Sequence, residues 1–253
     1  MTIKGEGPMT AAVLPSLSQD QLRAYHEDGY LVVADVFSPE ELQAIDEEID
    51  RELPDNEDRA AHRPGWIFGM RSELTKNVAR DERVLTLIED IVQPGIAIHS
   101  AKLVAKVPGA EIECHWHQDE TFYRTPSDPA THSQTRMSTW IPLQDADESN
   151  GCLWVVPGSH RWGLQPYILV DYGQCRRKLT KEEYANEKAI PVRVPAGSVV
   201  LFSAWTWHHS KINHTDRVRR AFIVSYQEAT LTDRTAEWRL LRPAPEKSNQ
   251  QAD

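Results

Sequence analysis

The sequence contains few cysteines, a deficit of basic residues and no long apolar run. Its 3 cysteines, Cys114, Cys152 and Cys175, are few and odd in number, which does not suit a disulfide framework. We therefore expect all of them to be free thiols in a reducing cytoplasm. No apolar run reaches the roughly 18 residues of a transmembrane helix, and no charged and then apolar leader is present. We therefore expect no membrane partner, no export and a cytoplasmic location.

Positive charge is the second deficit. The chain has 28 Lys and Arg residues against 38 Asp and Glu residues, which gives a net charge of −10. Because nucleic-acid binding depends on clustered basic side chains, this balance argues against a nucleic-acid partner. A chain of 253 residues can form one barrel with appended helices. We expect a single domain over 1–253, with flexible tails at 1–14 and 243–253.

Helical patterns occur in the first third of the chain. Ser18 and Gln21 have the spacing of a capping box, which predicts a helix that runs to about Asp28 and ends at Gly29. A short strand is predicted directly after it. Two further helices are predicted, over Pro39–Arg51, where Ser38 begins a second capping box, and over Glu82–Ile91.

From Ile96 onward the pattern is that of β-strands separated by Pro and Gly turns. Strands are predicted over 96–107, 112–118, 137–143, 152–156, 190–194, 198–203, 206–210 and 219–228. This pattern predicts a mainly β protein with flanking helices: a double-stranded β-helix of the jelly-roll or cupin type, buttressed by N-terminal α-helices. The long polar segment 161–188 between two of these strands is interpreted as a substrate lid.

The most informative stretch is His117-Gln118-Asp119. Residues two apart on a strand point to the same face, so His117 and Asp119 can bind one edge of a metal ion. Two histidines and one carboxylate, with the remaining positions open, suit a non-heme Fe(II) oxygenase. The same spacing occurs in His26/Asp28 and His214/Asp216, at a predicted helix end and in a polar turn, so the wider context has to decide.

That context consists of motifs in a fixed order. They are KLVAKVP at 102–108, HQD at 117–119, WIPL at 140–143, NGCLWVVPGSH at 150–160, PAGSVVLF at 195–202 and HHSKIN at 208–213. Together they resemble the phytanoyl-CoA dioxygenase family of Fe(II)- and 2-oxoglutarate-dependent oxygenases, over roughly 17–228. The resemblance implies an enzyme that uses Fe(II), O2 and 2-oxoglutarate. Such an enzyme hydroxylates a small-molecule metabolite and releases succinate and CO2.

The resemblance also assigns roles to particular positions. It implies that His117, Asp119 and His208 bind the iron and act in catalysis. The family's carboxylate-binding arginine follows the distal histidine by eleven positions, which is Arg219 in this sequence. A cosubstrate-binding hydroxyl two positions after that histidine falls on Ser210.

The distal motif offers a second register, because His209 stands where the family has glycine. In that register His209 would bind the metal and Arg220 would bind the cosubstrate, but the position of Ser210 favours His208 as the ligand. Strand alternation puts Arg219 and Arg220 on opposite faces, so only one of them can point into the site. A guanidinium suits the role because it is planar, always charged and able to bind a carboxylate through two hydrogen bonds.

Four more residues are assigned to the site. The resemblance places Trp140 and Lys102 near the cosubstrate; a core tryptophan and a lysine that snorkels from a barrel rim are the alternatives. Phe122 and Tyr123 lie just after Asp119 and are expected to line a substrate pocket. By the same resemblance, the retained carboxylate of Asp119 argues against halogenation, because halogenating relatives have a small residue there.

Two other functions compete with an oxygenase. One is a catalytically inactive metal- or ligand-binding barrel of the cupin type, and the other is a metal-dependent isomerase or hydrolase on such a barrel. The three retained ligands and Arg219 argue against the first, and the second would have no use for Arg219 and Ser210 as a carboxylate anchor. The substrate is left open, although an acyl-CoA would require a basic patch for its phosphates, for which 176–178 is the only lid cluster.

Overall fold

The computed structural model of the protein describes residues 16–52, 72–109, 113–123, 133–171, 176–231 and 239–245. The predicted tail at 1–14 and most of the one at 243–253 lie outside these ranges. The helices are α1 (Gln19–Asp28), α2 (Pro39–Glu52), α4 (Glu73–Ala79), α5 (Glu82–Ile88), α6 (Glu120–Tyr123) and α7 (Glu182–Lys188). The strands are β1 (Tyr30–Val33), β2 (Ile96–Lys106), β3 (Cys114–His117), β4 (Met137–Pro142), β5 (Leu153–Val155), β6 (Tyr167–Leu169), β7 (Arg177–Leu179), β8 (Ile190–Val192), β9 (Val199–Ser203), β10 (His208–Ser210), β11 (Arg219–Gln227) and β12 (Leu240–Arg242).

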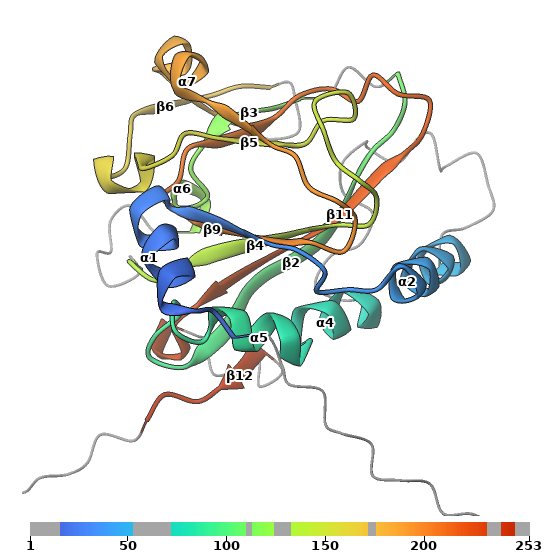
Figure 1. Ribbon diagram of the computed structural model, residues 1–253. Coiled ribbons are helices and arrows are strands. Elements are labelled where there is room, and N and C mark those ends of the chain that lie inside the picture. Colours follow the sequence, from blue (N-terminus) through green and yellow to red (C-terminus); the bar gives the residue numbers. More distant parts are fainter. Residues whose placement is uncertain are drawn as a thin grey trace, which may run out of the picture.

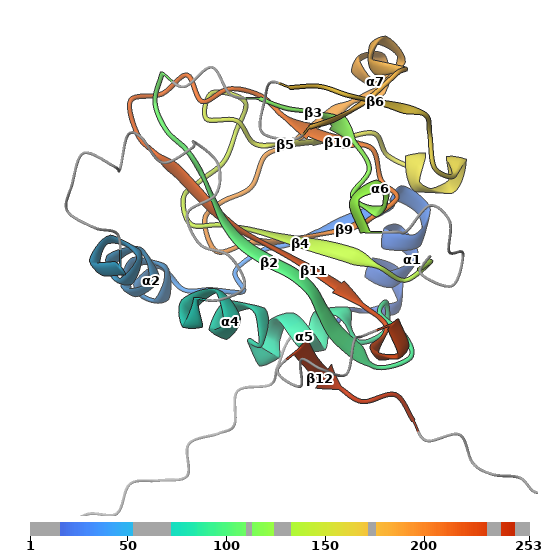
Figure 2. The same ribbon diagram turned by 180° about the vertical axis from the view of Figure 1, so that it is seen from behind.

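The strands form two main antiparallel sheets that face each other (Figure 1). The major sheet has the order β1-β9-β4-β11-β2-β12, and the minor sheet has the order β3-β10-β5-β8. Helices α4 and α5 cover the outer face of the major sheet, whereas β6, β7 and α7 lie beyond the minor sheet (Figures 1 and 2). The predicted jelly-roll architecture with N-terminal helices as its buttress is confirmed.

Three apolar cores lie between the layers. The first packs helical side chains such as Ile88 against Phe222 and Val224 of β11. The second, between the sheets, joins Ala221 of β11 to Val155 of β5. In β11 the alternation of side chains therefore sends even-numbered residues to the helices and odd-numbered residues to the space between the sheets. This alternation decides where each arginine at the start of the strand can point.

The helix signals of the sequence correspond to real caps. Ser18 and Gln21 exchange side-chain and backbone hydrogen bonds at the start of α1, and Gly29 ends this helix with φ 77, a left-handed conformation that glycine adopts at no steric cost. Ser38 and Glu41 form the second capping box, with bonds of 2.8 and 3.2 Å. All eight strands predicted from Ile96 onward are present, whereas α4, α6, α7, β6, β7 and β12 were not predicted.

The segment 161–188 contains the hairpin β6–β7 and helix α7. Its Leu179 and Ala185, with exposures of 1% and 0%, join the third apolar core against Trp116 and Trp207 on the outer face of the minor sheet. Asn186 accepts a hydrogen bond of 2.8 Å from the indole N–H of Trp116. The described part of the segment is therefore packed onto the fold, and its role as a lid stays a prediction.

The cysteines differ from the expectation. Cys152 is a free, buried thiol, whereas Cys114 is disulfide-bonded, so the prediction of three free cysteines is wrong for Cys114. Its partner lies outside the described residues. The fold places β3, which begins at Cys114, beside β7, an approach that the spacing of residues in the sequence does not reveal. No helix among the described residues is long and apolar enough to cross a membrane.

Candidate active site

The three predicted metal ligands converge at one edge of the minor sheet. His117 ends β3, His208 begins β10, and the two residues are direct partners in the antiparallel pairing of these strands. Asp119 lies in the turn between β3 and α6, one residue beyond the predicted strand, and it still meets the histidines. Its Oδ1 is 3.5 Å from His117 Nε2 and 3.6 Å from His208 Nε2. One potential ligand atom from each residue lies within 4.8 Å of the others, which is the spacing of a metal site.

Both histidine rings are oriented by backbone carbonyls. His117 Nδ1 lies 2.7 Å from the carbonyl oxygen of His115, and His208 Nδ1 lies 2.9 Å from that of Thr206. A carbonyl only accepts hydrogen bonds, so each Nδ1 carries the proton and each Nε2 offers its lone pair to the cluster. Burial lowers the pKa of His117, which favours the neutral imidazole that binds metals.

Asp119 has two oxygens in different surroundings. Oδ1 faces the histidines, whereas Oδ2 accepts a hydrogen bond of 2.6 Å from Ser138, whose hydroxyl lies 2.9 Å from that of Ser225. Although burial opposes it, the adjacent rings of His208 and His117 hold the pKa of Asp119 well below its usual range. The carboxylate is thus ionised and offers one free oxygen. Ser138 was not predicted, yet it lies on the same face of β4 as the predicted Trp140, so strand alternation could have found it.

A cavity beside the cluster contains most of the other predicted residues. Its lining consists of Lys102, Val104, Cys114, His117, Asp119, Trp140, Leu153, Phe202, His208, His209, Ser210, Arg219 and Ile223. Burial lowers the pKa of Lys102 to about 8. Phe122 is 40% exposed and presents its ring edge-on to His117 at 5.6 Å, and Tyr123 belongs to α6, with its side chain outside what is described.

Arg219 is a buried cation without a carboxylate partner among the described residues. It is 2% exposed, and its Nη2 donates to the carbonyl of Gly151 at 3.1 Å. Its Nε and Nη1 have no hydrogen-bond partner in the described part of the chain. The guanidinium carbon lies 5.4 Å from the ring centre of Trp140. Burial lowers the pKa of Arg219 to about 10, so the side chain is charged at neutral pH and an anion would satisfy it.

The neighbouring residues of the second register make other contacts. Arg220 makes ion pairs of 2.7 Å with Asp46 and with Asp50 of α2, on the outer side of the major sheet. The ring of His209 stacks on Trp116 at 4.1 Å with an angle of 27° between the planes. Only His208, of the two adjacent histidines, belongs to the metal-sized cluster. The geometry therefore agrees with the register of His208 and Arg219.

Comparison with known proteins identifies the family. The family model of phytanoyl-CoA dioxygenase (PhyH) matches residues 25–221. The chain belongs to this family. It is 27% identical over 268 residues to an ectoine dioxygenase of Bordetella parapertussis, covering 96% of this chain and 84% of the relative. It is also 27% identical over 237 residues to a probable alpha-ketoglutarate-dependent hypophosphite dioxygenase of Stutzerimonas stutzeri, covering 83% and 78%.

Solved structures agree on the fold. EctD from S. alaskensis, determined with 2-oxoglutarate and 5-hydroxyectoine, has a TM-score of 0.66, 23% identity and coverage of 88% of this chain and 83% of that one. The carbocyclase SnoK from nogalamycin biosynthesis has a TM-score of 0.63, 24% identity and coverage of 88% of both chains. As a family member with the histidine-aspartate-histidine cluster, the protein is a 2-oxoglutarate-dependent non-heme iron dioxygenase, with Fe(II) and 2-oxoglutarate as its cofactors.

Proposed function

We propose that this dioxygenase hydroxylates a small organic molecule, with His117, Asp119 and His208 as the iron ligands and Arg219 as the anchor of 2-oxoglutarate. The observation that carries the proposal is the buried guanidinium of Arg219, which lines the same cavity as the ligand cluster and has two nitrogen atoms without a partner among the described residues. A buried cation of this kind requires an anion. The donor set fits Fe(II), and the cation fits a dicarboxylate.

When bound, Fe(II), 2-oxoglutarate and O2 supply the oxidation of a substrate C–H bond, coupled to release of succinate and CO2. The chain provides two neutral imidazoles and a single carboxylate oxygen as donors. Because Oδ2 of Asp119 is engaged by Ser138, Oδ1 is the carboxylate oxygen that would hold the metal. The retained carboxylate favours oxygenation over halogenation.

The residues opposite the cluster hold the cosubstrate. Arg219 binds the far carboxylate of 2-oxoglutarate, and the ring of Trp140 lies against the guanidinium. Ser210 contributes its hydroxyl, and Lys102 adds a buried amine to the guanidinium of Arg219 in the same cavity. These side chains fix the cosubstrate and exclude water from it, which leaves the exposed side near Phe122 for the organic substrate.

The charges of the 176–178 cluster favour a small substrate over an acyl-CoA. Arg176 pairs with Asp171 at 2.9 Å, and Lys178 pairs with Glu182 at 2.6 Å. Arg177 lies over the ring of Phe122 at 4.5 Å and donates to the carbonyl of Thr121. Two of the three cations are thus neutralised by the segment itself, so the cluster is a poor match for the phosphates of coenzyme A.

The test is iron-dependent release of succinate from 2-oxoglutarate in air. We expect the wild-type protein to release succinate slowly without an organic substrate and faster when a substrate is present. That substrate should gain an oxygen atom from O2. His208→Ala should lose metal binding and turnover, whereas His209→Asn should keep both. A wild-type protein that binds metal or 2-oxoglutarate but releases no succinate would favour the inactive metal- or ligand-binding barrel. Loss of metal binding and turnover in His209→Asn alone would move the distal ligand by one residue.

A further inference from the structure

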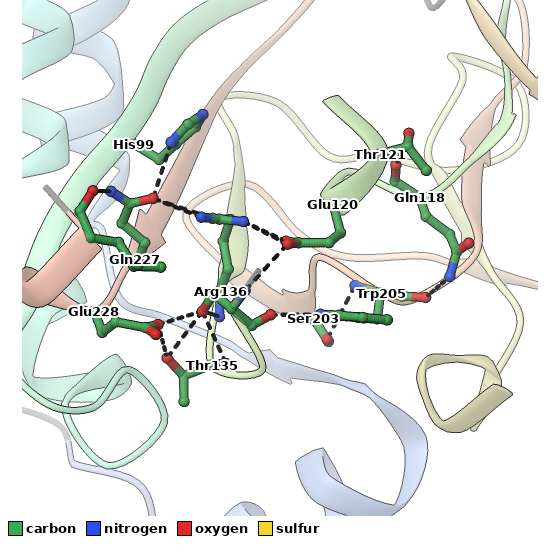
Figure 3. Close-up of polar contacts among 12 residues, drawn as sticks. His99, Gln118, Glu120, Thr121, Thr135, Arg136, Ser203, Trp205, Gln227 and Glu228 are labelled. Atoms are coloured by element: carbon green, nitrogen blue, oxygen red, sulfur yellow. Dashed lines mark hydrogen bonds and ion pairs between the residues drawn. The ribbon is translucent and has the colours of Figure 1, made fainter. Parts of the chain in front are cut away.

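The two residues that flank Asp119 are fully buried, and among the described residues their side chains form no hydrogen bond with the metal cluster. Gln118 and Glu120 are both 0% exposed. Their side chains form hydrogen bonds with parts of the chain that are distant in sequence, and Figure 3 shows both within one connected region of polar contacts. The proposed reaction assigns no role to Gln118 or Glu120.

Glu120 forms a buried ion pair with Arg136. Nη1 of Arg136 lies 2.6 and 2.7 Å from the two carboxylate oxygens, and the side chains are 2% and 0% exposed. The backbone N–H of Ser133 donates to the same carboxylate at 3.3 Å. On its other side Arg136 donates from Nη2 to Oε1 of Gln227 at 3.0 Å, and Nδ1 of His99 lies 3.1 Å from that oxygen (Figure 3).

The same two flanking residues contact the turn that leads into His208. The backbone N–H of Glu120 donates to the carbonyl of Ala204 at 2.8 Å, and the side-chain amide of Gln118 donates to the carbonyl of Trp205 at 2.7 Å. The N–H of Ala204 donates in turn to the carbonyl of Arg136 at 3.0 Å. The carbonyl of the next residue in this turn, Thr206, orients the ring of His208.

These contacts connect two metal ligands through the protein alone. Asp119 lies between Gln118 and Glu120, both of which are attached to the turn at 204–206, and this turn positions His208. Arg136, the residue before β4, binds both sides: its side chain pairs with Glu120, and its carbonyl accepts from the N–H of Ala204. Hydrogen bonds within the protein therefore link both flanks of Asp119 to the turn that orients His208.

Stability alone does not account for a buried ion pair at this place. Removing a carboxylate and a guanidinium from water is costly, and an apolar pair of similar volume stabilises a fold at least as well in many cases. Residues that orient metal ligands without touching the metal, by contrast, affect affinity by about 10- to 100-fold. We propose that the Glu120–Arg136 ion pair and the Gln118 amide are positioning residues that hold Asp119 and His208 at ligand spacing in the metal-free protein.

This inference rests on the proposed function, because it takes Asp119 and His208 as metal ligands. The test separates metal affinity from folding stability. Glu120→Gln, Arg136→Gln and the double variant are compared in the full-length protein. Binding of Co(II) is followed by titration and by its visible spectrum, and stability is followed by denaturant unfolding of the metal-free protein.

Each single variant leaves one buried charge without its partner and should lose stability, whereas the double variant should recover much of it. All three should bind Co(II) about 10- to 100-fold more weakly than the wild type, with a changed spectrum, because the ligand turn is no longer held. Asp46→Asn is the matched control: it weakens the ion pair of Arg220 on the outer side of the major sheet, and should leave the Co(II) affinity unchanged.

Gln118→Leu provides an independent measurement, should the single variants fail to fold. It removes the hydrogen bonds that the side-chain amide donates to the carbonyls of Gly163 and Trp205, and it leaves the ion pair intact. This variant should also bind Co(II) more weakly. Wild-type affinity and spectrum in both the double variant and Gln118→Leu would overturn the inference while the proposed function stands. A wild-type protein that binds no Co(II) would overturn the proposed function and this inference together.

Discussion

The two oxygens of Asp119 differ in their hydrogen bonds, and this difference bears on which of them would hold a metal ion. A carboxylate left free on both oxygens can bind a metal through either or both of them. The 2.6 Å hydrogen bond from Ser138 engages Oδ2, and Ser225 holds the hydroxyl of Ser138 in place. A pair of serines on adjacent strands therefore engages Oδ2 and leaves Oδ1 of Asp119 for a metal ion.

Replacing Ser138 by alanine should lower metal affinity. Ser138→Ala leaves Oδ2 of Asp119 buried without its donor, and we expect a loss of roughly tenfold in Fe(II) or Co(II) affinity, measured by titration of the metal-free protein. Thr139→Val is the control, because its hydroxyl lies on the opposite side of β4, 3.4 Å from the carbonyl of Val224. Equal affinity in the wild type and Ser138→Ala would contradict this role.

His99 should make stability depend on pH. Burial, aided by the nearby charge of Arg136, lowers the pKa of His99 from 6.5 to about 4 in the folded protein. Between these two values the unfolded chain binds a proton that the folded chain does not, so the free energy of unfolding should fall as the pH falls from about 6.5 to about 4. The loss attributable to His99 is on the order of 3 kcal/mol at about 1.4 kcal/mol per pKa unit.

His99→Gln provides the comparison. This variant keeps a side chain that can donate to Gln227 but removes the titrating ring. As the pH falls from about 6.5 to about 4, its free energy of unfolding should therefore fall less than that of the wild type. Denaturant unfolding at several pH values measures it. Parallel pH profiles for the two proteins would show that His99 does not titrate as described.

At the level of elements, segment 161–188 combines features of a lid and of a fixed layer. Its α7 and β7 pack into an apolar core with Trp116 and Trp207, while Arg177 extends to the ring of Phe122 near His117. The segment therefore has a fixed outer side and a polar contact at the exposed side of the metal site. Such a contact can govern the organic substrate without affecting the cosubstrate.

Removing that contact should uncouple the two halves of the reaction. Arg177→Ala is expected to reduce product formation by about tenfold or more, while slow succinate release without substrate persists, because the ligands of iron and 2-oxoglutarate are untouched. Arg176→Ala is the matched control, since its guanidinium is exposed and pairs with Asp171. The ratio of product to succinate measures the effect, and an unchanged ratio in Arg177→Ala would make the segment a passive insertion.

Elements with strong local signals could be predicted from the sequence. Capping residues such as Ser18 and Ser38 mark helix starts, and alternation marks the strands from Ile96 onward, because these signals reside in neighbouring residues. The strands β6, β7 and β12 were not recognised, because apolar and polar residues do not alternate along them. The polar composition of 161–188 also conceals the few buried residues, such as Leu179, that attach it to the minor sheet.

The site divides in the same way. Alternation in β11 separates Arg219 from Arg220, and the His117 and Asp119 spacing survives although the strand ends between them. The pair of Glu120 and Arg136 was not predicted, because the two residues are 16 positions apart and meet only in the folded protein. Contacts of that kind depend on tertiary structure, and no local pattern contains them.

At the scale of the whole molecule, the site is divided between the two sheets. The histidine ligands belong to β3 and β10 of the minor sheet, whereas Lys102, Trp140 and Arg219 belong to β2, β4 and β11 of the major sheet. A cosubstrate bound at once to the metal and to Arg219 therefore connects the sheets. Its binding should stabilise the whole molecule, because ligands that bind only the folded state shift the unfolding equilibrium.

We expect 2-oxoglutarate to raise the melting temperature by about 5–10 °C at a hundredfold excess over its dissociation constant, in the presence of Mn(II) as an inert substitute for iron. Arg219→Ala should lose this increment and keep that of Mn(II), with an apparent 2-oxoglutarate constant about 10- to 100-fold higher. Arg220→Ala should start from a lower melting temperature and keep both increments. A normal 2-oxoglutarate increment in Arg219→Ala would exclude this residue as the anchor.

The disulfide of Cys114 has a consequence for the choice of metal. Cys114 is the only sulfur-bearing residue among the described residues that line the cavity, and its Sγ lies 3.5 Å from Nδ1 of His117. A thiolate there would be a soft donor of the kind that selects zinc or copper(I). Since oxidation removes the thiolate, the metal-sized group beside this cysteine offers an ion nitrogen and oxygen donors, and the soft sulfur donor is withheld.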